Sequence, residues 1–327
     1  MKTRFVKMAA LVAACVMSVC AQAQDVQMAT LQHGEQMTAY YGPEAFIQAM
    51  AGAQQGDLIS LSAGTFYSAK VDKAVTIQGA GYVQDAANGR YRTVIEGDLD
   101  VEVPAGQTGF CLEGVYSNNT LRFRDIAQFE VKKLRIRSVD FWDWNNNEQQ
   151  GTNGLFDQCR IETLQLRNSQ NILVQNSLCY VIDSSNQATV SVRNCTVLYA
   201  TSCSANITNS IIAWPNGGTS FYNNVTCGEI NSQVQDGNKR IENWDTYLGI
   251  FTNPSRADSF NDDYDYRLTA AAASQYLGND GTQVGMYGGA KPFTDVPTNP
   301  QITQKEVAPQ SDANGKLQVK FTIEAQQ

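Results

Sequence analysis

Apolar and polar residues alternate in short runs along the middle of the chain, and four of these runs share one pattern. Each run has an apolar residue, a polar spacer, an amide, a small residue and a second apolar residue two positions further on. Alternation with a period of two places one face of a short β-strand in a core. The runs begin 18, 18 and 15 residues apart, at Phe156, Val174, Val192 and Ile207. A period this short predicts a solenoid in which each run is one rung.

The amide of each run follows the strand, where it bends the chain by adopting a positive φ. When identical turns stack at the strand spacing of about 4.8 Å, their side-chain amides can hydrogen-bond to one another. We therefore expect a structural ladder up one edge of the solenoid, made of Gln158, Asn176, Asn194 and Asn209. An alternative register, shifted by one sheet, stays open because residues 164–167 and 190–193 also resemble each other.

The length of the rungs varies, which argues against the strict six-residue rhythm of left-handed β-helices. The predicted fold class is therefore all-β, a right-handed parallel β-helix. Residues 43–50 are amphipathic with Pro43 at their start, which predicts a short helix. Such a helix would cover the open end of the solenoid.

Two motifs follow this helix: Gly-Asp-Leu-Ile-Ser-Leu with Ala-Gly-Thr-Phe in residues 56–66, and Ala-Val-Thr-Ile-Gln-Gly-Ala-Gly in residues 74–81. They resemble the opening of pectate-lyase-like right-handed β-helix proteins. Residues 265–268 and 284–289 resemble the last coils of exported bacterial members. The resemblance covers most of residues 40–290. It implies the fold but no single activity, because that superfamily includes lyases, hydrolases, esterases and non-catalytic binders.

The repeats end before three prolines, Pro292, Pro297 and Pro300, which indicate an extended linker. Residues 301–307 and 316–324 are strand-like and are joined through Asn314-Gly315, a strong hairpin signal. The expected organisation is a signal peptide at 1–23, a β-helix domain at 24–291, and a linker with a β-hairpin appendage at 292–327. We expect the appendage to pair along the solenoid and blunt its C-terminal edge.

The first residues have the layout of a secretory signal, with Lys2, Arg4 and Lys7 before an apolar run and Ala21-Gln22-Ala23 after it. The run is too short to span a bilayer, and no second apolar stretch follows. Cleavage after Ala23 predicts a secreted protein in the periplasm, on the cell surface or in the medium. Lipidation at Cys20 is the rival interpretation.

Removing the signal changes the formal net charge from −8 to −8 − 3 = −11. A surface this acidic repels phosphate backbones, so we expect no nucleic acid partner. The same negative charge disfavours acidic polysaccharides as partners, unless a local basic patch attracts them more strongly than the rest of the surface repels them.

His33 is the single histidine and lies outside the repeats. Mechanisms that need a histidine pair, a histidine–metal cluster or a Ser-His-Asp triad in the solenoid are therefore excluded. The Asn-Thr-Asp, paired aspartate and Gly-His-Gly motifs of pectin-hydrolysing relatives are absent too, so the resemblance carries over no catalytic residue.

Two other features are candidates for chemistry. The first is a set of basic residues on two predicted strands, either a solvated face paired with acids or a lyase site: Arg122, Arg124, Lys133, Arg135 and Arg137. The second is a loop that breaks the repeat and mixes ring faces with polar groups, as sugar sites do. Its candidate ligand-binding residues are Asp140, Phe141, Trp142, Asp143 and Trp144, with Trp214 extending the same surface.

No metal site is expected, although Ca²⁺ is possible at an acidic cluster formed by Asp258, Asp262, Asp263 and Asp265. The cysteines lead to a further expectation. Ser177 lies between Cys159 and Cys195 in the repeat, so two rungs, roughly 9–10 Å, separate their sulfur atoms, which is too far for a disulfide. We expect Cys159, Cys179 and Cys195 to be buried free thiols.

Three functions from different classes remain. The leading hypothesis is a carbohydrate-interacting, non-catalytic exported protein whose partner is a polysaccharide or glycan. The first alternative is a polysaccharide lyase or glycoside hydrolase, centred on the arginine strands or the Asp140–Trp144 loop. The second is a structural or adhesive surface protein. The sequence leaves the oligomeric state open.

Overall fold

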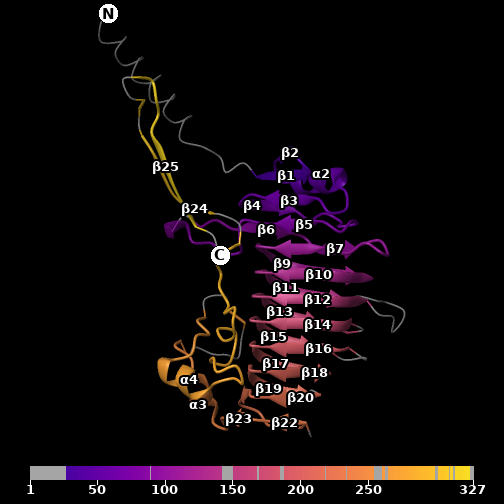
Figure 1. The fold of residues 1–327 in the computed structure, drawn as a ribbon, viewed down its shortest axis with the longest axis vertical. Helices are drawn as coiled ribbons and strands as arrows, with labels where there is room; N and C mark the ends of the chain where they lie inside the picture. Colours follow the sequence, from indigo (N-terminus) through magenta and orange to yellow (C-terminus); the bar gives the residue numbers. More distant parts are fainter. Residues whose placement is uncertain are drawn as a thin grey trace, which may run out of the picture.

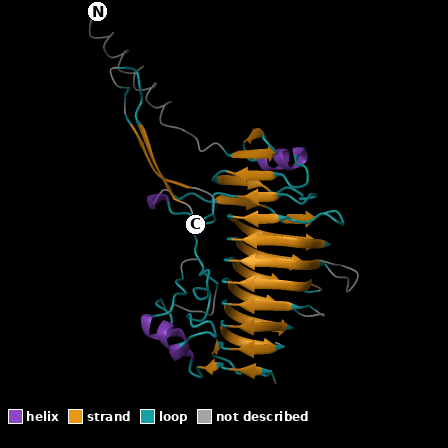
Figure 2. Cartoon of the chain, in the orientation of Figure 1, coloured by secondary structure: helices purple, strands orange, loops and turns teal. Residues whose placement is uncertain are grey.

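The chain folds as a two-sheet solenoid in a computed structural model. The structure describes residues 27–88, 90–141, 150–167, 169–184, 188–217, 219–232, 234–253, 260–261, 264–298, 301–308, 310–311 and 314–324. The strands alternate between two sheets as the chain coils, so sequence neighbours lie in different sheets and each strand pairs with its counterpart one rung away. Figures 1 and 2 show these strands stacked along one axis. The chain is thus the expected all-β, right-handed parallel β-helix.

The first sheet, sheet A, has twelve strands, of which the first two form an antiparallel cap. They are β2 (Gln36–Tyr41), β1 (Met28–His33), β3 (Leu58–Leu61), β5 (Thr76–Gln78), β8 (Cys111–Glu113), β10 (Ile126–Lys132), β12 (Gly151–Asp157), β14 (Ser169–Gln175), β16 (Val190–Arg193), β18 (Ala205–Thr208), β20 (Ser220–Tyr222) and β22 (Gln235–Asp236).

The second sheet, sheet B, has eleven strands. They are β4 (Gly64–Tyr67), β6 (Thr93–Glu96), β7 (Leu99–Glu102), β9 (Val115–Arg124), β11 (Arg135–Phe141), β13 (Arg160–Gln165), β15 (Leu178–Asp183), β17 (Thr196–Cys203), β19 (Ile211–Gly217), β21 (Val225–Thr226) and β23 (Lys239–Arg240). Val190 pairs with Ile172 in sheet A while Leu164 lies in sheet B, so the first of the two predicted registers is the correct one.

One turn column connects sheet A to sheet B on successive rungs. From β8 to β22, the residue after each sheet A strand has a positive φ, between 45° and 70°, at Gly114, Lys133, Gln158, Asn176, Asn194, Asn209, Asn223 and Gly237. The strands before them are in register, which places all eight in one column. The predicted column is confirmed, and it extends beyond the four residues that the sequence identified.

The predicted hydrogen bonds within this column are wrong. Four of these side chains point out of the solenoid and bind a later part of the chain, residues 278–298, which we call the strap. Asn176 Nδ2 donates to the carbonyls of Met286 and Gly288, at 3.1 and 2.7 Å. On other rungs the strap contacts are Asn209 with Asn279, Gln158 with the Pro292 carbonyl, and Lys133 Nζ with the Val296 carbonyl. These hydrogen bonds tie the turn column to the strap instead of to the neighbouring rung.

An amide ladder does occur one position further along, at the foot of the solenoid. Asn224 Nδ2 donates to Asn238 Oδ1 at 3.0 Å. Higher in the same column the backbone N–H groups of Cys159 and Cys195 donate to the hydroxyls of Ser177 and Ser210 on the next rung, both at 3.0 Å. Small polar residues and cysteines therefore alternate there, as the repeats predicted.

The N-terminal end is covered by the β1–β2 hairpin and by helix α2 (Ala45–Gly52), close to the expected residues 43–50. Four helix side chains, Ala45, Phe46, Ala49 and Met50, are buried in the main core. The two opening motifs form β3, β4 and β5, as the resemblance implied. No helix within the described ranges is long and apolar enough to cross a membrane.

After the last coil, the described residues between 241 and 298 pack against the outer face of sheet B. They contain helices α3 (Trp244–Leu248) and α4 (Ala270–Gln275) and end in the strap (Figure 1). A second core lies beneath them, in which outward-facing Leu178, Ile211 and Val225 meet Tyr247, Phe251 and Met286, among others. Residues 265–268 and 284–289 belong to this covering layer, so the expectation that they form the last coils is wrong.

The C-terminal strands β24 (Gln301–Val307) and β25 (Val319–Glu324) pair antiparallel with each other, as the hairpin signal predicted. They form a separate two-stranded sheet and, among the described strands, pair with none of the solenoid. The expected pairing along the solenoid edge is therefore wrong. In Figure 1 the hairpin extends away from the coils.

The interior of the middle coils contains a cluster of phenylalanines. Phe141 lies 5.1 Å from Phe123 and 5.8 Å from Phe129 between ring centroids, and it is only 2% exposed. A Cβ on Gly151 would lie 2.3 Å from the Phe141 ring, so this glycine makes room for it. Phe141 is a core residue, and its expected role in ligand binding is wrong. Phe141 is the last residue of β11, and its side chain points into the core, as the alternation of inward and outward residues along that strand requires.

Hydrogen bonding to the strap predicts a measurable difference between two asparagines of the turn column. Asn176→Gly keeps the positive φ but removes two hydrogen bonds, and should lower the free energy of unfolding by about 1–3 kcal/mol. Asn194→Gly is the matched control, because Asn194 Nδ2 has no hydrogen-bond partner within the described residues. Urea unfolding of both variants tests this. Equal losses of stability would contradict the role of the strap.

Burial predicts the reactivity of the thiols. Cys159, Cys179 and Cys195 are free and fully buried, as expected, and Cys111 and Cys227 are free as well. Burial raises the pKa of Cys195 to about 12 and that of Cys111 to about 11, which suppresses the reactive thiolate. Titration of the folded protein should find few reactive thiols, and denaturation without reductant should release at least three. A Cys159–Cys195 disulfide in mass spectrometry would contradict the rung assignment.

Candidate functional site: an arginine and tyrosine cleft

A cleft lies where the upper strands of sheet B meet the strap and the loop of residues 79–92. Its floor is one outward-facing column of three residues, Tyr116 on β9, Arg135 on β11 and Arg160 on β13. Neighbours in such a column are about 4.8 Å apart along the solenoid. The same column continues on lower rungs with Leu178, Thr196 and Ile211. These three residues are buried beneath the layer formed by the chain after residue 241. The cleft is therefore the part of the column that is polar.

The cleft contains two cavities of about 240 Å³ each, which share Arg160 and Asp295. The first cavity is also lined by Tyr82, Val83, Gln84, Arg92, Tyr116 and Arg135. The second is also lined by Tyr264, Asp265, Arg267, Tyr287, Phe293 and Thr294. Asp295 comes from the strap and forms an ion pair with Arg90 at 3.6 Å. The strap thus forms one wall of both cavities.

Aromatic rings hold the guanidinium groups of the cleft in place. Arg92 Cζ lies 3.8 Å from the centroid of the Tyr116 ring, and Arg135 Cζ lies 5.2 Å from the same centroid. Arg135 also lies 5.0 Å from the Phe260 ring, and Arg160 lies 5.4 Å from the Phe293 ring. A guanidinium over a ring face is attracted by the ring quadrupole and stays oriented. The cations are consequently ordered before any ligand arrives.

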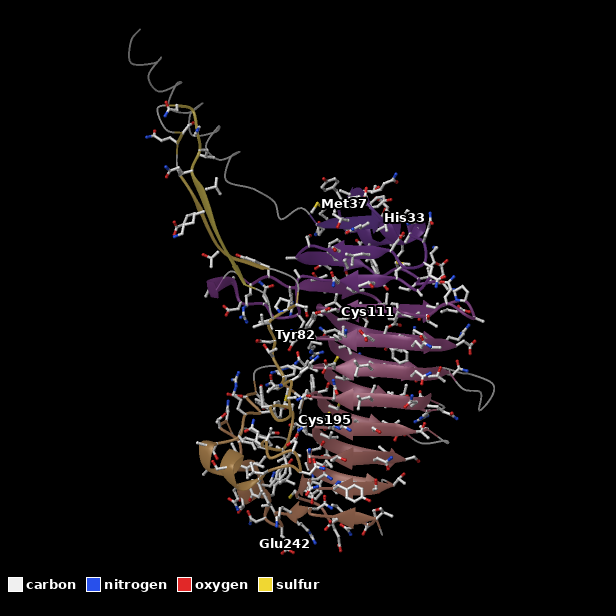
Figure 3. All side chains as sticks on the ribbon, viewed as in Figure 1. His33, Met37, Tyr82, Cys111, Cys195 and Glu242 are labelled. Carbon is white, nitrogen blue, oxygen red and sulfur yellow. The ribbon has the colours of Figure 1, made fainter. Side chains whose placement is uncertain are left out.

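Tyr82 is the most buried polar group of the first cavity. Its side chain is 6% exposed, and its hydroxyl has no hydrogen-bond partner within the described part of the chain. Burial raises the pKa of the phenol far above its ordinary value, so the hydroxyl keeps its proton. Figure 3 places Tyr82 on the flank of the solenoid that faces the strap.

Of the predicted site residues that the structure describes, only Arg135 lines the cleft. Arg137 is exposed on β11 and lines neither cavity. Asp140 is half-buried at the far end of the same strand, two rungs from Asp183. Trp142, Asp143 and Trp144 lie outside the described residues.

Trp214 lies several rungs from strand β11, which precedes the predicted loop. It lies on β19, four strands from β11 in sheet B, which is roughly 19 Å at a strand spacing of about 4.8 Å. Its ring stacks on Trp244 of α3 at 5.5 Å and is 41% exposed. Trp214 therefore anchors the covering layer. That it extends the surface of the 140–144 loop stays a prediction, because Trp142, Asp143 and Trp144 lie outside the described residues.

The remaining basic candidates make structural contacts. Arg122 pairs with Asp98 at 2.6 Å and with Asp100 at 3.3 Å, and Arg124 pairs with Glu102 at 3.4 Å. Arg122 and Arg124 are thus ion-paired, as the solvated-face interpretation had it, with partners on and next to β7, whereas Lys133 and Arg135 are buried. Within the described ranges no group of three or more His, Cys, Asp or Glu side chains lies close enough to hold a metal. Three members of the acidic cluster, Asp258, Asp262 and Asp263, lie outside those ranges, so the expectation that no metal site forms there is not tested.

Sequence reasoning missed Tyr82, Arg92, Tyr116 and Arg160. One signal was present: the repeats at 131–136 and 156–161 both have arginine in the fifth place, which puts Arg135 and Arg160 in one column. Tyr82 and Asp295 are more than 200 residues apart in sequence and meet only because the strap returns along the solenoid.

These features define the class of protein: a right-handed parallel β-helix with an arginine- and tyrosine-lined cleft on its flank. Comparison with known proteins adds no relative, because no family model, no curated protein and no solved structure matches the chain.

The environment of Asp140 leads to a test of its role by pH. Burial is the largest influence on this carboxyl and raises its pKa, while Arg122 and Arg167 lower it. The ionised form is therefore disfavoured by folding, at a cost present at neutral pH and lost as the pH falls below the ordinary value of 3.8. Asp140→Asn should raise the melting temperature at neutral pH, and the gain should vanish in acid. A lower melting temperature at neutral pH would show that the arginines outweigh burial.

Proposed function

We propose that this chain is an exported protein that binds a carbohydrate without turning it over, with the arginine and tyrosine cleft as its binding site. The observation that carries the proposal is the lining of the two cavities, which combines oriented guanidinium donors with tyrosine rings and hydroxyls. Sugars are bound by such a mixture, because ring faces contact C–H groups while polar groups bind the hydroxyls.

The size and placement of the cavities support a short oligosaccharide. Each cavity, at about 240 Å³, is smaller than the roughly 300–1,000 Å³ typical of sites for drug-sized ligands. Two adjacent cavities that share Arg160 and Asp295 suit two linked sugar units better than one large ligand. Export rests on the N-terminal sequence, where a basic start, an apolar run and Ala21-Gln22-Ala23 have the layout of a secretory signal.

The carboxylates of the cleft favour binding over hydrolysis. A glycosidase needs two carboxyl groups, one of which holds a proton for the leaving group. The carboxylates that line the cavities are Asp265, paired with Arg267 at 3.3 Å, and Asp295, paired with Arg90 at 3.6 Å. Both are used in ion pairs that shape the cavity walls.

A polysaccharide lyase is the second candidate, and the arginines beside Tyr82 are the observation that favours it. Cations that neutralise a sugar carboxylate would make the adjacent C–H group more acidic. A lyase also needs a base, and burial raises the pKa of the Tyr82 phenol, so this hydroxyl donates a proton rather than removing one. The cleft therefore offers charge stabilisation but no base among these residues, which favours binding.

A glycan array with the chain lacking residues 1–23, run with and without Ca²⁺, tests the proposal. We expect binding without release of product. Arg160→Gln should weaken that binding about tenfold or more, because hydrogen bonds from a charged donor contribute about 1.5–3 kcal/mol. Arg124→Gln is the control, since Arg124 is an exposed, ion-paired arginine outside both cavities.

Each other outcome of this experiment counts against the proposal. Release of unsaturated or hydrolysed sugars would establish the lyase or hydrolase alternative. No binding on a broad panel would favour the structural or adhesive alternative. Equal effects of Arg160→Gln and Arg124→Gln would place the glycan site elsewhere on the molecule.

A further inference from the structure

Strand β2 forms the edge of sheet A at the N-terminal end of the solenoid (Figure 1). Its six residues pair along their whole length with β1 and, among the described strands, with no other. Met37 and Tyr41 are 68% and 63% exposed, more than any other large hydrophobic side chain within the described ranges. Figure 3 labels Met37 at this end of the molecule. An edge strand of this length can pair with a strand of another chain.

Strand β2 lacks the features by which proteins usually prevent such pairing, which are charges, proline, bulges and short length. Residues 36–41 contain no charged residue and no proline, and their register with β1 has no bulge. The other exposed edges do have such features. At the far end of the solenoid, β22 and β23 are two residues long and include Asp236, Lys239 and Arg240. Both strands of the C-terminal hairpin contain lysine.

The pairing with β1 determines which backbone groups of β2 face the free edge. His33 and Gln36 flank a two-residue turn, and in such a hairpin the flanking pair is hydrogen-bonded. Hydrogen-bonded pairs then recur at every second residue of an antiparallel ladder. At the other end of the hairpin, the Gly42 N–H donates to the Gln27 carbonyl at 2.8 Å, as this alternation requires.

Two sets of residues therefore alternate along β2. The residues bonded to β1 are Gln36, Thr38 and Tyr40. The residues whose N–H and C=O groups face the free edge are Met37, Ala39 and Tyr41. Side chains alternate in the same way: Tyr40 packs against the main core, while Met37 and Tyr41 are exposed. The free edge thus combines unpaired backbone groups with two exposed apolar side chains.

The hairpin that contains β2 is fixed to the solenoid. His33 Nδ1 lies 2.6 Å from Asp57 Oδ1, beside the turn of the hairpin. The second carboxylate oxygen, Asp57 Oδ2, accepts a hydrogen bond from the backbone N–H of Gln54 at 2.7 Å. An edge held in this way needs little ordering when a second strand pairs with it, which lowers the cost of association.

We propose that β2 is a dimerisation edge, which pairs antiparallel with β2 of a second copy of this chain. The twofold axis passes through Ala39, so that sheet A continues from one molecule into the other. In this register Met37 of each copy lies opposite Tyr41 of the other, and each residue pairs with one whose side chain faces the same side of the sheet. This inference goes beyond the proposed function and does not depend on glycan binding.

The composition of the edge favours a second copy as the partner. Each exposed methionine meets an exposed tyrosine ring, and contact of sulfur with an aromatic ring is favourable. No acid lies opposite an acid, because Glu35 of one copy falls opposite Pro43 of the other. A single strand pair is smaller than the standard interface of roughly 1,600 Å². We therefore expect a dimer that forms reversibly and dissociates on dilution.

Sedimentation velocity of the purified protein, from low to high micromolar concentration, tests for this dimer. We expect a reversible equilibrium between monomer and dimer. Sodium chloride should favour the dimer, because each copy has a formal net charge of −8 and salt screens the repulsion between them. A monomer at every concentration would overturn the proposal. An open-ended series of oligomers would also overturn it, because pairing about a twofold axis closes on itself.

A charge on the edge should prevent the pairing. Met37→Lys removes the contact with Tyr41 and should raise the dissociation constant of the dimer about tenfold or more. The matched control is Leu277→Lys, which makes the same charge change at a side chain that is 49% exposed in the covering layer. Both variants should keep the melting temperature of the dilute protein. Dimerisation of Met37→Lys as tight as wild type, or equal weakening in both variants, would overturn the proposal.

Cross-linking tests the register. In the proposed dimer the two Ala39 Cα atoms are roughly 5.5 Å apart, as in a hydrogen-bonded antiparallel pair. The two Gln36 residues are offset by six positions along the strands, roughly 20 Å. A short bismaleimide should therefore cross-link Ala39→Cys into a dimer and leave Gln36→Cys monomeric, with the wild type as the background of the natural thiols. Equal cross-linking of both variants would overturn the register, and cross-linking of neither would overturn the edge as the interface.

Discussion

The positive φ adopted after the sheet A strands is the constraint on which the rest of the structure depends. It turns the chain from sheet A into sheet B within two residues, so each coil stays short and the next strand enters in register. Residues with little penalty for this conformation, asparagine and glycine, occupy most of the column. Lys133 and Gln158 are the exceptions, and both have side chains that reach the strap.

The same turn column determines where the strap runs. Because its side chains point outward, successive rungs present donors along one edge, and the strap carbonyls accept from them between Met286 and Val296. The strap covers apolar outward residues of the lower rungs and leaves the polar residues of the upper rungs beside Asp295. The cleft thus lies where the buried lower residues of this sheet B column give way to Arg160, Arg135 and Tyr116.

The repeat pattern was sufficient to predict the coils, the turn column and the free cysteines, because these depend on contacts between equivalent positions of neighbouring rungs. It was not sufficient for residues that contact the covering layer. The partners of Asn176 were predicted wrongly since residues 278–298 have no repeat to align with the turns. Phe141 was assigned to the loop because its inward position depends on its register with Phe123, which the sequence did not reveal. Tyr82 had no local signal of any kind.

An acidic chain with a cationic cleft has a property that neither feature has alone. The net charge repels anionic polymers from most of the surface, while the buried arginines are screened less by salt than exposed charges are. The rings of Tyr116 and Phe260 hold Arg135 away from solvent, so the positive field of this arginine stays local to the cleft. The acidic composition argues against acidic polysaccharides over the surface as a whole, and the arginines of the cleft are a local basic patch that opposes this repulsion.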